Sequence, residues 1–277
     1  MHRNGYAETS IPTIGKRLRH LAKFCDLDNP RDVKRFIAAK RVKNSFKDNL
    51  CDAYGYYLRV HGLSWTRPRY QPEQRLPKTP TSEALEKIIA RASWRYATIF
   101  SILRDTGMMP VELERTSLRD IDLERGVINA VGCKGHKPRA LKLKTSTIAM
   151  LKRYLGENPK EYPFPKSESM SEAWKRYRND LAGKLNEATL KTIRLYDLRH
   201  YFGTMTYHRT RDILLVKHLM GHSKIETTLI YTRLVNFARD EYTVRAAATI
   251  EDAATLLEAG FEYICAWEEK QLYRKRK

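Results

Sequence analysis

Cysteine is scarce in this sequence, and its four copies are scattered. They are Cys25, Cys51, Cys133 and Cys265, and none belongs to a Cys-x-x-Cys pair. Zinc sites and disulfide frameworks both depend on closely or regularly spaced cysteines. The sequence therefore indicates neither a zinc site nor a disulfide scaffold, and we expect the four residues to be reduced packing residues.

Long apolar runs are also missing. No stretch approaches the roughly 18 consecutive apolar residues that a membrane-spanning helix requires, so the sequence excludes such a helix. The first ten residues, MHRNGYAETS, lack the apolar core of a secretory signal. We therefore expect a cytoplasmic, nucleoid-associated protein with no membrane partner.

Acidic residues are outnumbered by basic ones. The 277 residues include 52 Lys and Arg against 32 Asp and Glu, which gives a formal net charge of +20. Because the excess is spread along the chain while acidic residues stay frequent, a folded surface with basic stripes is favoured over a basic arm. Nucleic acid is the expected partner, and an anionic membrane surface or mere solubility are the alternatives. The length suits two domains.

The first 64 residues have the apolar spacing of a helical domain. Apolar residues recur at helical intervals from Ile14, Pro30 stands at the first position of a second helix, and a third helix is expected from about Val42 to Val60. Basic side chains remain for the outside of this module. Those assigned to DNA are Lys16, Arg17, Arg19, Lys43 and Lys47. The alternative is an ordinary solvated helical bundle.

Residues 65–81 are predicted to form a linker. Four prolines among charged residues, in WTRPRYQPEQRLPKTPT, cannot continue a helix or a central strand, so a semi-extended segment is expected. Two domains joined across it could form a clamp around a duplex. Arg67 and Arg69 are therefore also assigned to DNA.

A second domain is expected over residues 82–240, mainly helical with a small β element. One long helix should begin with Ser82 as its cap and run to about Arg104, and another should begin at Pro110. The period then changes to that of strands over residues 127–131 and 140–143. Between the strands, Lys134, Lys137 and Arg139 occupy a hairpin tip suited to reach a groove or a phosphate. A loop lysine is by default only a solvated charge.

Helices are expected further on over residues 145–154, 170–185, 197–208 and 211–219, followed by an amphipathic helix from about Lys224. Residues 241–277 are predicted to form a β-α-β tail, with strands over 242–247 and 261–267 and a helix over 250–259. So small a unit needs support. We expect it to pack on the second domain or on a neighbouring subunit.

Arg199, His222 and Tyr231 follow one another in an order that suits chemistry on a phosphodiester. The planar guanidinium of an arginine can hold two phosphate oxygens at once. His222 follows Gly221, where a turn is expected to expose it, and a tyrosine can attack phosphorus and remain as covalent phosphotyrosine. A lone Arg, His or Tyr is far more often a surface or core residue, so the arrangement carries the argument.

Three motifs around these residues resemble the C-terminal signature of tyrosine recombinases, the phage-type integrases. They are Tyr196-Asp197-Leu198-Arg199-His200, Met220-Gly221-His222 and Thr227-Thr228-Leu229-Ile230-Tyr231-Thr232. The resemblance covers about residues 82–234 and implies the α+β catalytic fold of that family there. The helical front matches the family's core-binding domain by position, and the tail looks most like that of archaeal integrases.

The resemblance also implies a role for each residue. Tyr231 is the nucleophile, Arg199 stabilises charge on the non-bridging oxygens, His222 gives those oxygens a second hydrogen bond, and Lys134 protonates the departing 5′ oxygen. Tyr196 stands where the family usually has a histidine and can still hydrogen-bond a phosphate oxygen. Cationic side chains replace a metal in this chemistry, so neither a metal nor another cofactor is expected.

One position departs from the family pattern in a way that puts activity in question. The turn that normally reads Thr-Gly-x-Arg reads Thr106-Gly107-Met108-Met109 here, so Met109 replaces the first of two phosphate-binding arginines. Loss of one preorganised donor typically costs about 2.7–4 kcal/mol of transition-state stabilisation. Arg104, Arg115 or an arginine of a partner subunit is the alternative source of the missing charge.

The sequence thus predicts a site-specific DNA recombinase of an archaeal mobile element, which cuts and rejoins strands through a 3′-phosphotyrosine intermediate. It is expected to act on double-stranded DNA as a homo-oligomer of up to four subunits. One alternative, favoured by Met109, is an inactive descendant that binds DNA as an architectural or regulatory protein. Another is an enzyme like type IB topoisomerases, which share the phosphotyrosine chemistry.

Overall fold

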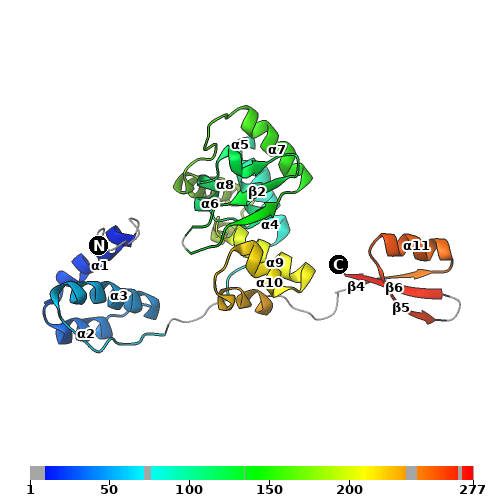
Figure 1. Cartoon of the computed structure of the whole chain (residues 1–277). Coiled ribbons are helices and arrows are strands. Elements are labelled where there is room, and N and C mark those ends of the chain that lie inside the picture. The colour runs from blue at the N-terminus through cyan, green and yellow to red at the C-terminus, as the bar shows by residue number, and fades with distance from the viewer. Residues whose placement is uncertain (1–9, 72–75, 134, 235–241, 268–269, 277) are drawn as a thin grey trace. The chain divides into compact units, whose positions relative to one another are not determined.

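The computed structural model describes residues 10–71, 76–133, 135–234, 242–267 and 270–276. Contacts divide the chain into two units, Met1–Arg75 and Leu76–Lys277. Helices dominate both units, and the only sheets among the described residues are two small antiparallel ones (Figure 1). The predicted fold class, mainly α with small β elements, is therefore confirmed.

The first unit is a three-helix module, formed by α1 (Ser10–Ala22), α2 (Pro30–Ala39) and α3 (Asn44–His61). Asn29 fixes the start of α2, because its side chain accepts hydrogen bonds from the backbone amides of the first helical turn. The helices bury a shared apolar core, which includes Leu21, Val33, Ile37, Leu50 and Tyr54. The three predicted helices are present.

The start of the predicted linker lies against this first unit. The Trp65 ring packs edge-on against Tyr54 with a centroid distance of 4.8 Å. Arg67 forms ion pairs with Asp48 and Asp52, each at 2.8 Å. Residues 65–71 form neither helix nor strand, as the prolines predict. The contacts of Trp65 and Arg67 hold this segment against the first unit.

The second unit begins with two helices where one was predicted, α4 (Ser82–Arg91) and α5 (Trp94–Thr106). Extended backbone at Ala92 and Ser93 separates them and lets both pack against α8. The apolar spacing continues across the break, which is why the sequence did not reveal it. Thr81 rather than Ser82 caps α4, with its hydroxyl accepting from the Ala84 amide at 3.2 Å.

The rest of the core of the second unit alternates helices with a small sheet. In order it contains α6 (Pro110–Glu114), η2 (Leu118–Asp120), β1 (Ile121–Asp122), β2 (Val127–Ala130), β3 (Arg139–Lys142), α7 (Thr145–Gly156), α8 (Ser167–Lys184), η3 (Ala188–Thr192), α9 (Asp197–Thr210) and α10 (Ile213–Met220). The strands pair in the order β1-β2-β3, and Ile128 lies opposite Leu141. Both side chains are buried in the main core, so the sheet faces the helices.

The segment that carries Tyr231 is not the predicted amphipathic helix. It forms two short 3₁₀ turns, η4 (Ile225–Thr227) and η5 (Leu229–Arg233). The β-branched Thr227 and Thr228 disfavour a longer helix, and the Thr228 hydroxyl is instead bonded to His222. The turns bring Tyr231 back toward α9 and α10.

The C-terminal region contains a strand that the sequence reading missed. It forms β4 (Tyr242–Ala247), α11 (Ile250–Glu258), β5 (Glu262–Trp267) and β6 (Lys270–Arg276), and β6 lies between the other two strands. The predicted strand, helix and strand are present, but the basic end is itself a strand, β6, so the expectation of a merely basic end is wrong. Tyr273 holds β6 in place, because its ring is buried with Ala247 and Ala253 despite the basic residues around it. That this region packs on the preceding domain or on a partner stays a prediction.

Three of the four cysteines are packing residues, as predicted, while Cys265 is exposed. Within the described ranges no group of three His, Cys, Asp or Glu side chains is placed to hold a metal ion. No helix among those ranges combines the length and apolarity needed to cross a bilayer.

Candidate active site

The C-terminal end of α10 brings the three predicted catalytic residues together. Arg199 donates from Nη2 to the carbonyl oxygen of Met220 at 2.5 Å, and from Nη1 to that of Gly107 at 2.6 Å. The Met220 side chain lies in the same buried cluster as Tyr231. His222 follows two residues later. Arg199 and Tyr231 therefore meet at Met220, and His222 lies close enough for the charge of Arg199 to act on its imidazole.

Arg199 is almost wholly enclosed, with 2% of its surface exposed. Its Nε has no hydrogen-bond partner among the described residues. Burial lowers the guanidinium pKa, but an arginine starts so high that it stays charged. A charged guanidinium whose Nε lacks a partner is suited to bind an anionic oxygen.

Tyr231 is enclosed as well, with 1% of its surface exposed. Its hydroxyl lies 3.3 Å from Nδ1 of His200, and burial raises its pKa although the charge of Arg199 opposes the shift. The ring packs against Gly203 of the same chain's α9. A Cβ at residue 203 would lie 2.7 Å from Tyr231 Cζ, so only glycine leaves room for the ring.

His222 is buried, which corrects the expectation that the turn exposes it. Gly221 ends α10 with φ of 69°, and this left-handed turn points the next residue inward. The imidazole Nδ1 of His222 lies 2.9 Å from the Thr228 hydroxyl. Burial, assisted by the positive charges of Arg199 and His136, lowers the pKa of His222 to about 3. The imidazole is therefore neutral at physiological pH.

Arg139 is not at an exposed hairpin tip, so its assignment to DNA is wrong. Its side chain is fully buried, and Nη1 and Nη2 donate to the two carboxylate oxygens of Glu112, each at 2.9 Å. Its Nε donates to the Leu219 carbonyl at 2.6 Å. The buried carboxylate three residues after Met109 is the partner that the sequence did not reveal.

The hairpin between β2 and β3 is fastened to the His222 turn. The Lys137 amide donates to the Gly221 carbonyl at 3.0 Å, while the Lys137 side chain is exposed and available to DNA. Lys134, the predicted general acid, lies outside the described residues.

Met109 is the N-terminal cap residue of α6, and its amide donates to Glu112 at 2.8 Å. Burial favours a raised pKa for Glu112, but the hydrogen bonds and charge of Arg139 hold that pKa below its usual range. The carboxylate is therefore ionised. Residue 109 contributes no positive charge here. The charges of Arg139 and Glu112 offset each other, and Arg199 lies near this pair.

Arg104, one suggested substitute for the missing arginine, is committed elsewhere. It pairs with Glu86 at 2.5 Å and with Asp105 at 3.0 Å. Arg115 is exposed at the end of α6. The structure gives neither residue a contact with the group around Met220, within the residues that it describes.

Tyr196 stands beside His200, with ring centroids 5.2 Å apart, and is 43% exposed. It borders the site rather than lying within it. His200 and Thr228 are the polar partners that sequence reasoning missed, although both lie inside the quoted motifs. Their roles depend on the packing of η5, which the sequence did not predict.

The remaining residues assigned to DNA are mostly available on the surface. Lys16, Arg19, Lys43 and Arg69 are exposed, Arg17 and Lys47 are half-buried, and Arg67 is held by its two aspartates. Lys47 also donates to the Ala38 carbonyl at 2.7 Å. These contacts leave the assignments to DNA as predictions.

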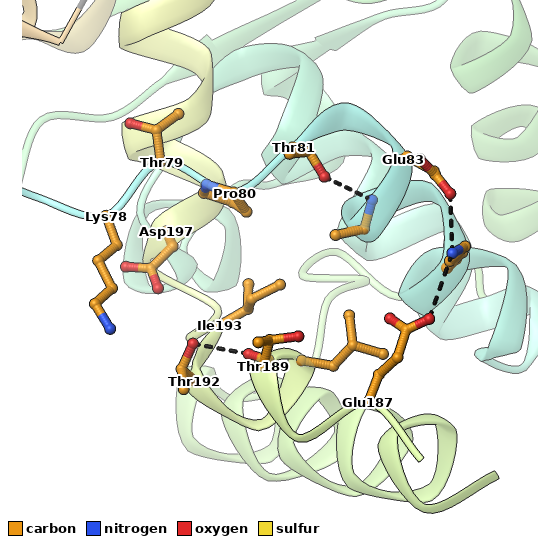
Figure 2. Close-up of a pocket in the computed structure, with 13 residues that line it drawn as sticks. Lys78, Thr79, Pro80, Thr81, Glu83, Glu187, Thr189, Thr192, Ile193 and Asp197 are labelled. Atoms are coloured by element: carbon orange, nitrogen blue, oxygen red, sulfur yellow. Dashed lines mark hydrogen bonds and ion pairs between the residues drawn. The ribbon is translucent and has the colours of Figure 1, made fainter. Parts of the chain in front are cut away.

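A separate pocket adjoins the start of α4 (Figure 2). Lys78, Thr79, Pro80 and Thr81 form one wall, and Glu187, Thr189, Thr192 and Ile193 form the opposite one. Lys87 bridges Glu83 and Glu187 at 2.9 and 3.7 Å. None of the predicted catalytic residues lines this pocket, so it is distinct from the site around Met220.

The model of the phage integrase family matches residues 78–236, more than half of the chain, and the chain belongs to this family. The predicted membership among tyrosine recombinases of the phage integrase type is thereby confirmed. The tyrosine recombinase XerA of Pyrococcus furiosus is 29% identical over 221 residues, which are 74% of this chain and 76% of the relative. The tyrosine recombinase XerD of Listeria innocua is 28% identical over 237 residues, with 74% and 72% covered.

Solved structures share the fold. A Tn1549 transposon integrase in complex with transposon right end DNA superposes with a TM-score of 0.66 at 15% identity, covering 93% of this chain and 95% of that one. A lambda integrase dimer bound to a COC′ core site gives a TM-score of 0.65 at 13% identity, with 85% and 92% covered. At such low sequence identity, these structural similarities show only that the fold is shared.

Proposed function

We propose that this protein is a site-specific DNA recombinase that cuts and rejoins DNA through a phosphotyrosine at Tyr231. The observation that carries the proposal is that Arg199 and Tyr231 meet at Met220, with His222 close enough to be influenced by the charge of Arg199. Relatives named tyrosine recombinase, and structural neighbours solved with DNA, support double-stranded DNA as the substrate. A homo-oligomer of up to four subunits on DNA, and action within the nucleoid, belong to the same proposal.

The proposed chemistry conserves bond energy. The Tyr231 oxygen, once deprotonated, attacks phosphorus, and the phosphorus–5′ oxygen bond breaks as the new bond forms. Lys134 protonates the departing 5′ oxygen. In the reverse direction a 5′ hydroxyl of a second strand attacks the phosphotyrosine and releases the phenol, so no external energy source enters.

Arg199 supports this chemistry with a fixed charge. Nη1 and Nη2 each donate to a backbone carbonyl, which orients the guanidinium, and we assign the unpartnered Nε to a non-bridging oxygen of the bound phosphate. Neutral His222 can donate from Nε2 when its Nδ1 accepts the hydrogen of Thr228. Donors that are held in place before the reaction stabilise developing charge most effectively.

A suicide duplex, nicked so that the cleaved end diffuses away, tests the proposal. The wild-type protein should form a covalent DNA adduct that survives denaturing electrophoresis, and Tyr231→Phe should form none. Tyr263→Phe, at an exposed tyrosine outside the site, is the matched control and should behave as wild type. An adduct that survives Tyr231→Phe would remove Tyr231 from the mechanism.

A second candidate is an inactive relative that binds DNA without cutting it. Met109 is the observation that favours it, because it removes a cation beside Arg199. Such a protein would bind duplexes with the steep salt dependence of phosphate contacts and form no adduct on any of them. Covalent adduct formation by the unaltered chain would rule this candidate out.

A further inference from the structure

The hydroxyl of Tyr231 has one hydrogen-bond partner among the described residues, Nδ1 of His200 at 3.3 Å. An attacking phenol must give up its proton, and a general base has to lie within reach of that proton. The mechanism proposed above leaves this base unassigned. The partner of the Tyr231 hydroxyl is therefore the first residue to consider.

The other groups of the site are poor proton acceptors. Arg199 carries a permanent charge, and His222 has its Nδ1 committed to Thr228 and loses basicity through burial. Tyr196 stands where the family usually has a histidine, but it is 43% exposed and its ring contacts His200 at the border of the site. These exclusions leave His200, which lies in the first turn of α9.

We infer that His200 is the general base that takes the proton of Tyr231 during strand cleavage. The inference rests on the proposed function and adds a catalytic residue to it. In the tautomer with hydrogen on Nε2, Nδ1 accepts the phenol proton as the tyrosine oxygen bonds to phosphorus. During religation the same imidazolium returns that proton to the departing phenolate, so the proton balance closes over a full cycle.

The surroundings of His200 suit both steps. Burial lowers the pKa of His200, with the charges of Arg194 and Arg199 acting in the same direction, so the resting imidazole is neutral. The Asp197 carboxylate acts in the opposite direction and favours the imidazolium once it forms. Asp197 is itself fixed by hydrogen bonds from the amide and guanidinium of Arg194. Tyr196 and Tyr231 are the other ring neighbours.

A purely structural role for His200 makes different demands. If His200 only positions the Tyr231 ring, a hydrogen-bond acceptor at the place of Nδ1 is sufficient. If His200 is a base, that acceptor must also take up a proton. Asparagine places an amide oxygen near that position but does not take up a proton in this pH range. His200→Asn therefore separates the two roles without emptying the space.

The test measures the rate of covalent adduct formation on a suicide duplex as a function of pH. His200→Asn should bind DNA as wild type does and cleave about 10²-fold more slowly, since general bases contribute 10²–10⁴-fold. The wild-type rate should be flat above about pH 6.5, the ordinary pKa of histidine. The variant's rate should rise tenfold per pH unit, because hydroxide then removes the proton.

Chemical rescue gives a second readout, which a purely structural role of His200 would not produce. Imidazole added to His200→Ala should restore cleavage at least tenfold and should leave wild type and His200→Asn unchanged. His208→Ala, on the same helix and outside the site, is the control. Wild-type rates and an unchanged pH profile in His200→Asn, or no rescue of a folded His200→Ala, would overturn the inference.

Failure of the proposed function looks different. If the unaltered chain and Met109→Arg both form no adduct on any duplex, the phosphotyrosine mechanism falls and takes the role of His200 with it. If adduct forms and the His200 variants match wild type in rate, only the inference about His200 falls. The first outcome overturns both claims, whereas the second overturns the role of His200 alone.

Discussion

Arg139 and Glu112 form a buried ion pair with two parallel hydrogen bonds of 2.9 Å, and neither side chain touches solvent. The pair ties the β2–β3 hairpin to α6. The third donor of Arg139 holds the Leu219 carbonyl, one residue before the carbonyl that Arg199 holds. Two arginines from distant segments of the chain thus donate hydrogen bonds to consecutive carbonyls at the C-terminal end of α10. The helix dipole favours positive charge at this end.

Removing one partner of this pair should cost more than removing both. Arg139→Met leaves the Glu112 carboxylate buried without its cation, which typically costs about 3–5 kcal/mol of unfolding free energy. The double variant Arg139→Met with Glu112→Met should recover most of that loss, because two apolar side chains of similar length can fill the space. Denaturant unfolding of the three proteins measures the difference. A double variant as unstable as the single one would show that the two charges are not coupled.

Met109→Arg should raise activity. The new guanidinium would enter beside Arg199 and restore a second cation for the phosphate oxygens, and one such donor is typically worth about 10²–10³ in rate. The measurement is the rate of adduct formation on the suicide duplex. Met205→Arg, an exposed methionine on α9, adds the same charge away from the site and should have little effect. Equal rates in both variants would mean that the methionine at residue 109 is not the limiting defect.

Gly203→Ala should displace Tyr231. The added Cβ would lie 2.7 Å from both Tyr231 Cζ and Met220 Sδ, and overpacking of this kind typically costs about 1–3 kcal/mol. We expect lower thermal stability and loss of adduct, with DNA binding retained. Gly183→Ala lies in a helix where nothing approaches the new Cβ, so it should stabilise the protein instead. An unaffected Gly203→Ala protein would contradict the packing described for Tyr231.

Much of this site could be read from the sequence, and the misses have specific physical causes. Arg199, His222 and Tyr231 were identifiable because their motifs are local. The burial of Arg139 was not, since it depends on a carboxylate 27 residues earlier in the chain. Strand β6 was missed because its basic residues concealed the single buried ring of Tyr273. The 3₁₀ turns around Tyr231 replaced a predicted helix because Thr228 bonds His222 rather than continuing a helical pattern.

Acid should destabilise the fold through His222. Its pKa is about 3 in the folded protein and near 6.5 when unfolded, so between these values the unfolded chain binds the extra proton. The contribution of His222 to the unfolding free energy is fully present above about pH 6.5 and is lost as the pH falls toward 3. Between pH 7.5 and 5.5 the wild type should lose about 1 kcal/mol more unfolding free energy than His222→Gln. Equal losses in the two proteins would contradict the burial of a neutral His222.

The site of the covalent bond tests the central claim most directly. Trypsin cleaves after Lys224 and Arg233, so the peptide of residues 225–233 contains Tyr231 together with Thr227, Thr228 and Thr232. After reaction with a suicide duplex and nuclease digestion, fragmentation mass spectrometry should place the nucleotide remnant on the Tyr231 oxygen. A remnant on a threonine of this peptide, or on any other peptide, would contradict the account.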